Sequence, residues 1–125
     1  MSKELPSRVV LVIEDDPADR ALIRRLLLQH PRRYEVREAA SGVEGLAACA
    51  ATPPDCVLLD FHLPDMEGTE VLRGLAHGEG LVLTLPVAML SGVEDDAAAT
   101  AALQAGAQDY LLKDGLTARA LARAI

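Results

Sequence analysis

Short apolar segments alternate with segments of helical periodicity five times along the chain, and this alternation limits the possible folds more than any other feature. The predicted strands lie at Arg8–Ile13, Tyr34–Ala39, Val57–Leu59, Pro86–Leu90 and Asp109–Leu112. Most of them are continuous aliphatic runs, which is typical of strands that are buried on both faces. Strands that alternate with helices indicate right-handed crossovers and a parallel sheet. The sequence therefore predicts an α/β fold, a doubly wound five-stranded parallel sheet with helices on both faces.

Helix-start and helix-stop residues separate the predicted strands. Pro17 is placed to open a helix that Pro31 ends, and Ser41-Gly42-Val43-Glu44 has the form of a capping box. Gly106 is expected to stop a later helix. Further helices are predicted over 69–76, 94–105 and 117–125, and residues 78–85 are interpreted as a long connection.

Length and composition restrict the class of protein. A chain of 125 residues fits one domain with its own core, which must be aliphatic because the chain has two tyrosines, one phenylalanine and no tryptophan. The net charge of −7 argues against a nucleic-acid surface. No apolar run approaches the roughly 20 residues that span a bilayer, and Cys49 and Cys56 lack metal-site spacing. We expect a single soluble domain over residues 1–125 in the cytoplasm, whose short last helix also fits a domain excised from a longer chain.

Polar side chains follow four of the predicted strands at the point where each strand ends. Glu14 and Asp15 follow the first strand, Asp60 the third, Ser91 the fourth and Lys113 the fifth. Each residue alone could simply cap a helix or a turn. Because parallel strands all point the same way, these side chains are instead expected to meet at one sheet edge, where open α/β sheets bind ligands.

The residue types at this edge indicate phosphoryl chemistry. Neighbouring carboxylates repel one another unless a hard divalent cation neutralises them, and Mg²⁺ prefers oxygen ligands. A carboxylate can also act as a nucleophile and form an aspartyl phosphate. The hydroxyl of Ser91 and the ammonium of Lys113 would then contact the phosphoryl oxygens.

Together, these segments resemble the receiver domain of two-component response regulators over essentially the whole chain. The resemblance rests on the order and spacing of Val12–Pro17, Asp60–Gly68, Met89–Gly92 and Gly106–Lys113. It implies the flavodoxin-like fold with strand order 2-1-3-4-5. The chain departs from the family pattern at Asp114, where many receivers have a proline after the lysine.

The resemblance implies a phosphoacceptor and a metal site. Asp60 would accept the phosphoryl group, as an aspartyl phosphate. Glu14, Asp15 and Asp60 would hold Mg²⁺ (or Mn²⁺), and the backbone carbonyl of His62 would complete the protein ligands. Asp16 is expected to cap the following helix rather than to bind the metal.

The resemblance also implies a role in phosphorelay signalling. A sensor histidine kinase or phosphotransfer protein would phosphorylate the chain, which would catalyse only its own phosphorylation and dephosphorylation. Ser91 and Lys113 would bind the phosphoryl group, and Tyr110 would turn inward as Ser91 moves towards it. An effector domain or partner protein would recognise the altered surface, with no contact from this segment to nucleic acid or membrane.

Three other functions are compatible with parts of the pattern. The main alternative is a receiver-like interaction module that is never phosphorylated, although the complete set of Asp60, the acidic pair, Ser91 and Lys113 argues against it. A phosphatase of the haloacid dehalogenase type usually needs a second Asp two residues after the first, where this chain has His62. Flavin binding would require a phosphate-binding loop after the first strand, and none is present in the sequence.

Overall fold

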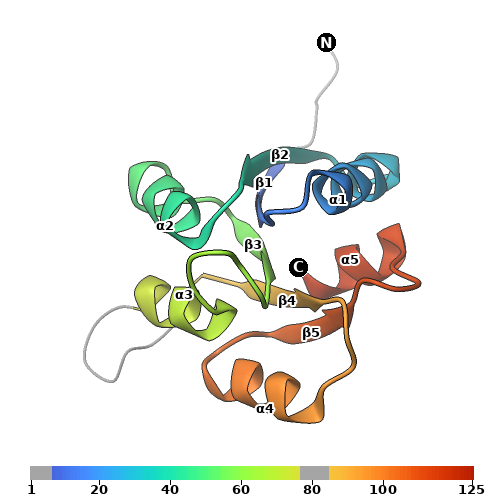
Figure 1. Cartoon of the computed structure of the whole chain (residues 1–125). Coiled ribbons are helices and arrows are strands. Elements are labelled where there is room, and N and C mark those ends of the chain that lie inside the picture. The colour runs from blue at the N-terminus through green and yellow to red at the C-terminus, as the bar shows by residue number, and fades with distance from the viewer. Residues whose placement is uncertain (1–6, 77–84) are drawn as a thin grey trace.

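The structure, a computed structural model, describes residues 7–76 and 85–125 as strands and helices in strict alternation (Figure 1). All strand pairs in the described part of the chain are parallel, and the sheet order is β2-β1-β3-β4-β5. The elements are β1 (Arg8–Ile13), α1 (Pro17–Gln29), β2 (Tyr34–Ala39), α2 (Gly42–Ala51), β3 (Cys56–Asp60), α3 (Gly68–Leu75), β4 (Val87–Ser91), α4 (Asp96–Gln104), β5 (Asp109–Leu112) and α5 (Ala118–Ala124). The predicted fold class and strand order are confirmed.

Helices cover both faces of the sheet, with α1 and α5 on one face and α2, α3 and α4 on the other (Figure 1). Successive side chains of β1 show why its sequence is continuously apolar. Val10 and Val12 pack in the core beneath α1 and α5, whereas Leu11 and Ile13 pack in the core beneath the other three helices. Because neither face of this strand meets water, polar alternation would place polar groups in a core.

Side-chain caps begin most of the helices in the described structure. Asp16 accepts a hydrogen bond from the backbone N–H of Ala18, as its predicted capping role requires. At α2, Ser41 Oγ accepts the N–H of Glu44, and the Glu44 carboxylate accepts the N–H of Ala40. The predicted capping box is therefore present, with its return bond made one residue earlier than in the usual arrangement.

Helices α4 and α5 are slightly shorter than the sequence predicts, whereas α3 has the predicted length and begins one residue earlier. Residues 94 and 95 precede α4, because Asp95 is its N-cap and accepts the N–H of Ala98. Gly106 follows with a φ of 111°, which is the left-handed conformation expected of a helix stop. Most of the predicted 78–85 connection lies outside the described residues. No helix within 7–76 and 85–125 is long and apolar enough to cross a membrane.

Gly45 provides a direct test of the packing between α2 and β1. A Cβ at this position would lie 2.4 Å from Cδ1 and 2.8 Å from Cγ1 of the fully buried Ile13. Gly45→Ala should overpack this contact at a cost in the upper part of the usual range of about 1–3 kcal/mol, because two Ile13 atoms would lie closer than 3.0 Å. This cost exceeds the gain of about 1 kcal/mol in helix propensity. We predict a lower free energy of unfolding, measured by urea denaturation. Gly92→Ala is the control, since its Cβ meets nothing within 4 Å, and an unchanged Gly45→Ala protein would contradict the packing.

Candidate functional site

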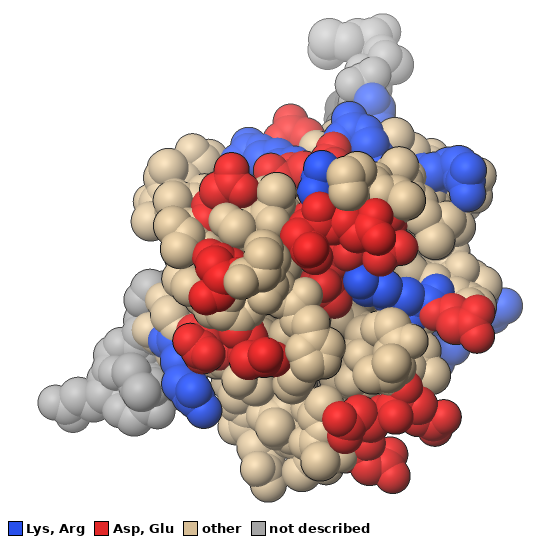
Figure 2. All heavy atoms as spheres, viewed as in Figure 1, with Lys and Arg blue, Asp and Glu red and all other residues tan. Residues whose placement is uncertain are grey.

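The carboxyl ends of the strands meet at one edge of the sheet, and backbone hydrogen bonds extend the pairing slightly beyond the strand ends. The N–H of Glu14 donates to the carbonyl of Ala39 at 3.0 Å, and the N–H of Lys113 donates to the carbonyl of Ser91 at 2.8 Å. These bonds fix Glu14 and Lys113 in register with the sheet. On the face shown in Figure 2, acidic side chains gather in the middle of the view, with basic side chains directly beside them.

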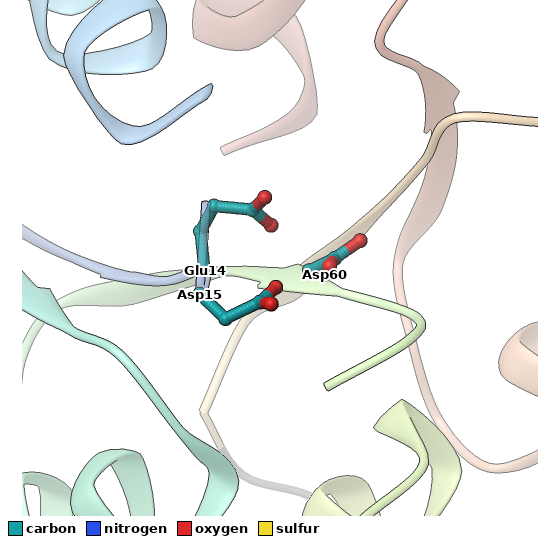
Figure 3. A group of neighbouring side chains, drawn as sticks. All are labelled: Glu14, Asp15 and Asp60. Atoms are coloured by element: carbon teal, nitrogen blue, oxygen red, sulfur yellow. The ribbon is translucent and has the colours of Figure 1, made fainter. Parts of the chain in front are cut away.

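Three carboxylates converge at this edge. Each of Glu14, Asp15 and Asp60 offers an oxygen within 4.8 Å of the oxygens offered by the other two. Figure 3 shows Glu14 and Asp15 projecting from consecutive positions after β1, on the side that faces Asp60. Glu14 and Asp60 are buried, with 1% and 5% of their surface exposed, whereas Asp15 is exposed to solvent. The predicted acidic cluster is thus brought together by the topology of the sheet.

The Lys113 ammonium contacts three carboxylates of the site. Its Nζ donates to Glu14 Oε1 at 2.9 Å and to Asp19 Oδ2 at 3.0 Å, and it lies 3.2 Å from Asp60 Oδ1. An ammonium has three N–H donors, so these contacts match its full bonding capacity. Lys113 is therefore held beside the predicted phosphoacceptor.

Sequence reasoning missed two residues of α1 that support the site. Asp19 supplies one of the three carboxylates on Lys113. The Arg20 guanidinium donates to the backbone carbonyls of Glu14 and Asp15, at 2.8 and 3.1 Å, and so holds the acidic turn. Both lie within the first turn of the helix that follows the carboxylates, and this proximity is the sequence signal that could have indicated them.

Burial controls the charge of Glu14. Desolvation and the neighbouring Asp60 together raise the pKa of Glu14 to about 8, although the hydrogen bond from Lys113 acts in the opposite direction. Burial by itself would lower the pKa of Lys113, but its contacts with Glu14, Asp19 and Asp60 outweigh that effect and raise it. Lys113 therefore stays cationic, while negative charge on Glu14 is disfavoured by its surroundings.

The donor set fits a hard divalent cation. All three converging groups are carboxylates, the ligand type that Mg²⁺ prefers. Glu14 Oε2 is buried and has no hydrogen-bond partner among the described residues. A cation at this cluster would satisfy that oxygen and offset the repulsion between Glu14 and Asp60.

Ser91 and Tyr110, the two predicted switch residues, differ in how their hydroxyl groups are bonded. The buried Ser91 hydroxyl donates to the carbonyl of Val93 at 3.0 Å and accepts the N–H of Val93 at 3.2 Å. Tyr110 packs edge-on against Phe61, with ring centroids 6.3 Å apart. Its hydroxyl is buried without a hydrogen-bond partner in the part of the chain that the structure describes. Ser91 must therefore give up its hydrogen bond to the Val93 carbonyl before its hydroxyl can donate elsewhere.

The structure places the side chain of His62 away from the carboxylate cluster. That side chain is exposed, and its Nδ1 lies 3.2 Å from Glu67 Oε2. The resemblance to receiver domains implies a metal ligand from the backbone carbonyl of His62, and the position of the side chain is compatible with that expectation. The Lys113–Asp114 peptide bond is trans, like the other bonds of the described ranges.

Comparison with known proteins identifies the family. The family described as the response regulator receiver domain matches residues 10–125. The chain belongs to this family. The receiver domain is 44% identical, over 106 residues, to the transcriptional regulatory protein KdpE of Mycobacterium tuberculosis H37Rv, covering 84% of this chain and 44% of that protein. It is 35% identical, over 114 residues, to the nitrate/nitrite response regulator NarL of Escherichia coli K12, covering 91% of this chain and 51% of NarL.

Solved structures show the same relationship. A CheY-like response regulator receiver domain protein from Methanospirillum hungatei JF-1 superposes with a TM-score of 0.78 at 30% identity, covering 94% of this chain and 90% of that chain. The chemotaxis protein CheY4 of Vibrio cholerae has the same fold, with a TM-score of 0.79 at 24% identity and coverage of 94% and 95%. The receiver domain spans about half the length of the two curated relatives named above.

The raised pKa of Glu14 predicts a pH dependence of stability. Without divalent cations, the native state holds a proton on Glu14 between its ordinary pKa of 4.5 and its native pKa of about 8. The unfolded state has released that proton, so the contribution of Glu14 to the free energy of unfolding should fall as pH rises through this range. Urea unfolding in EDTA at several pH values measures the slope.

Two variants isolate this contribution. Glu14→Gln cannot titrate and should flatten the slope, whereas Glu70→Gln, at an exposed position of α3, should retain it. An identical slope in Glu14→Gln and the wild type would show that Glu14 does not have a raised pKa.

Proposed function

We propose that this receiver domain is a phosphoacceptor module of a phosphorelay, in which Asp60 receives a phosphoryl group from a histidine kinase or phosphotransfer protein. The observation that supports this most strongly is the position of Asp60. Its carboxylate is buried at the end of the central strand β3, 3.2 Å from Lys113 and grouped with Glu14 and Asp15. A purely structural role does not require an acidic side chain to be buried beside two other carboxylates, where an apolar residue would pack without the cost of burying a polar group.

The proposed transfer forms one bond and breaks another. A carboxylate oxygen of Asp60 attacks the phosphorus atom of a phosphohistidine, and the phosphorus–nitrogen bond breaks with its electron pair returning to the imidazole. The product is an aspartyl phosphate on this chain and a histidine on the donor. Because the new phosphoryl group is anionic, positive groups around Asp60 should favour the transfer.

Lys113 and Ser91 are the groups of this chain that we assign to the phosphoryl oxygens. Lys113 already lies 3.2 Å from Asp60, so its ammonium can pair with a phosphoryl oxygen after a small movement. Ser91 would exchange its hydrogen bonds with Val93 for one to the phosphoryl group. We expect Tyr110 to turn inward as Ser91 moves, since the Tyr110 hydroxyl has no hydrogen-bond partner to hold it among the described residues.

A magnesium ion is part of the proposal. We assign Glu14, Asp15 and Asp60 to hold it, together with the backbone carbonyl of His62. When bound, Mg²⁺ or Mn²⁺ supplies positive charge to the carboxylates and the phosphoryl oxygens. The unpartnered Glu14 Oε2 is the feature of this chain that most directly favours such an ion.

We take residues 1–125 as one receiver domain acting in the cytoplasm with an effector domain or partner protein. Its matched region covers 44% of KdpE and 51% of NarL, proteins whose names describe a transcriptional regulator and a response regulator. Phosphorylation would alter the surface around α4 and Tyr110, and the effector would recognise that change.

Intact-mass spectrometry after incubation with acetyl phosphate and Mg²⁺ tests the proposed function. We predict that the wild type gains one phosphoryl group. The gain should disappear in Asp60→Asn, because the nucleophile is lost, and in EDTA, because the carboxylates are no longer neutralised. Asp109→Asn, which changes an exposed aspartate at the start of β5, should retain the gain and controls for the substitution itself.

Two results would contradict the proposal. A folded wild type that gains no phosphoryl group would favour the unphosphorylated interaction module. An equal gain in Asp60→Asn would show that another residue is the acceptor.

A further inference from the structure

Residues 61–67 connect β3 to α3, and we call them the acceptor loop. This loop includes His62, whose backbone carbonyl is the expected metal ligand. Backbone contacts join the first and last residues of the acceptor loop. The N–H of Gly68 donates to the carbonyl of Phe61 at 2.7 Å, and His62 pairs with Glu67 in an isolated antiparallel bridge. A Cβ at Gly68 would lie 3.1 Å from both the carbonyl oxygen of Asp60 and Cα of Phe61, so the loop closes tightly against the end of β3.

The tip of the acceptor loop is attached to a different helix. The Asp65 carboxylate accepts the backbone N–H groups of Gly42 and Val43, both at 2.9 Å, with one oxygen on each. These are the first two residues of α2, and the third N–H donates to Ser41. Helix caps normally come from the preceding residue, whereas this carboxylate lies 23 positions after Gly42. The same two amides lower the pKa of Asp65, since they stabilise its charged form.

Side-chain packing supports the same contact independently. Gly42 is buried, and a Cβ there would lie 2.4 Å from Cγ and 2.6 Å from Sδ of Met66. Met66 therefore lies directly over the start of α2, in the space that a larger residue at position 42 would fill. Hydrogen bonds from one loop residue and packing from the next hold the loop tip against α2.

We propose that Asp65 is a positioning residue, which holds the acceptor loop against α2 and thereby keeps the His62 backbone carbonyl in place for the divalent cation. This inference rests on the proposed function, because it requires a cation at the carboxylate cluster. Asp65 is not one of the three clustered carboxylates, so its removal leaves Glu14, Asp15 and Asp60 unchanged. Without its bonds to α2, the loop tip would be freer to move, and His62 lies only three residues before it.

Calorimetric titration of the cation-free protein with Mg²⁺ tests the inference. We expect Asp65→Ala to weaken Mg²⁺ binding on the order of tenfold, as the loss of supporting contacts around a metal site commonly does. Asp65→Asn keeps one acceptor oxygen and should bind with intermediate affinity. Asp95→Ala is the matched control, because it also removes a carboxylate cap from a helix but leaves the acceptor loop untouched. Circular dichroism verifies that each variant is folded at the titration temperature.

The possible outcomes separate this inference from the proposed function. Weaker binding in Asp65→Ala, with Asp95→Ala like the wild type, supports the positioning role. Unchanged affinity in Asp65→Ala, or an equal loss in both alanine variants, overturns that role while leaving the metal site intact. A wild type that does not bind Mg²⁺ overturns the metal assignment itself, and the positioning role with it.

Discussion

The contact of one ammonium with three carboxylates organises the functional edge of this receiver domain. Lys113 joins the end of β5 to Glu14 after β1, to Asp19 in α1 and to Asp60 at the end of β3. Its side chain is 18% exposed, so these charges interact in surroundings that are poorly screened by water. Removal of Lys113 would leave the buried carboxylates of Glu14 and Asp60 without a counter-charge, which is more costly than the loss of a surface pair.

The charge balance at this edge of the sheet would be sensitive to an added ion, and the ion pairs need not contribute much to the free energy of unfolding. Buried ion pairs often add little to the free energy of folding, because desolvation offsets the attraction between the charges. Here, burial and Asp60 disfavour the charge on Glu14, while one of its oxygens has no hydrogen-bond partner among the described residues. A cation or a phosphoryl group at Asp60 would therefore change the balance among groups from four elements, which is how a local charge event can bias a conformational equilibrium.

Periodicity and strand endings were sufficient to predict the fold class and the residues that converge at the sheet edge. Short aliphatic runs that alternate with helical segments indicate buried strands, and parallel strands bring their carboxyl ends together. Glu14, Asp15, Asp60 and Lys113 could therefore be placed at one edge from the sequence. The roles of Asp19 and Arg20 were not predicted, since an acidic or basic residue in a first helical turn usually faces solvent. The attachment of Asp65 to α2 was also missed, because local patterns do not reveal a helix cap that comes from more than twenty residues away.

Phosphate is proposed to enter this domain as an acyl phosphate on Asp60, and borohydride reduction followed by peptide mapping distinguishes that linkage and its position. Reduction converts an aspartyl phosphate to homoserine and leaves free carboxylates unchanged. After treatment with acetyl phosphate and Mg²⁺, we expect homoserine at position 60 in the peptide that contains β3. Homoserine at Asp15 or Asp19, or at no position in a protein shown to carry phosphate, would contradict it.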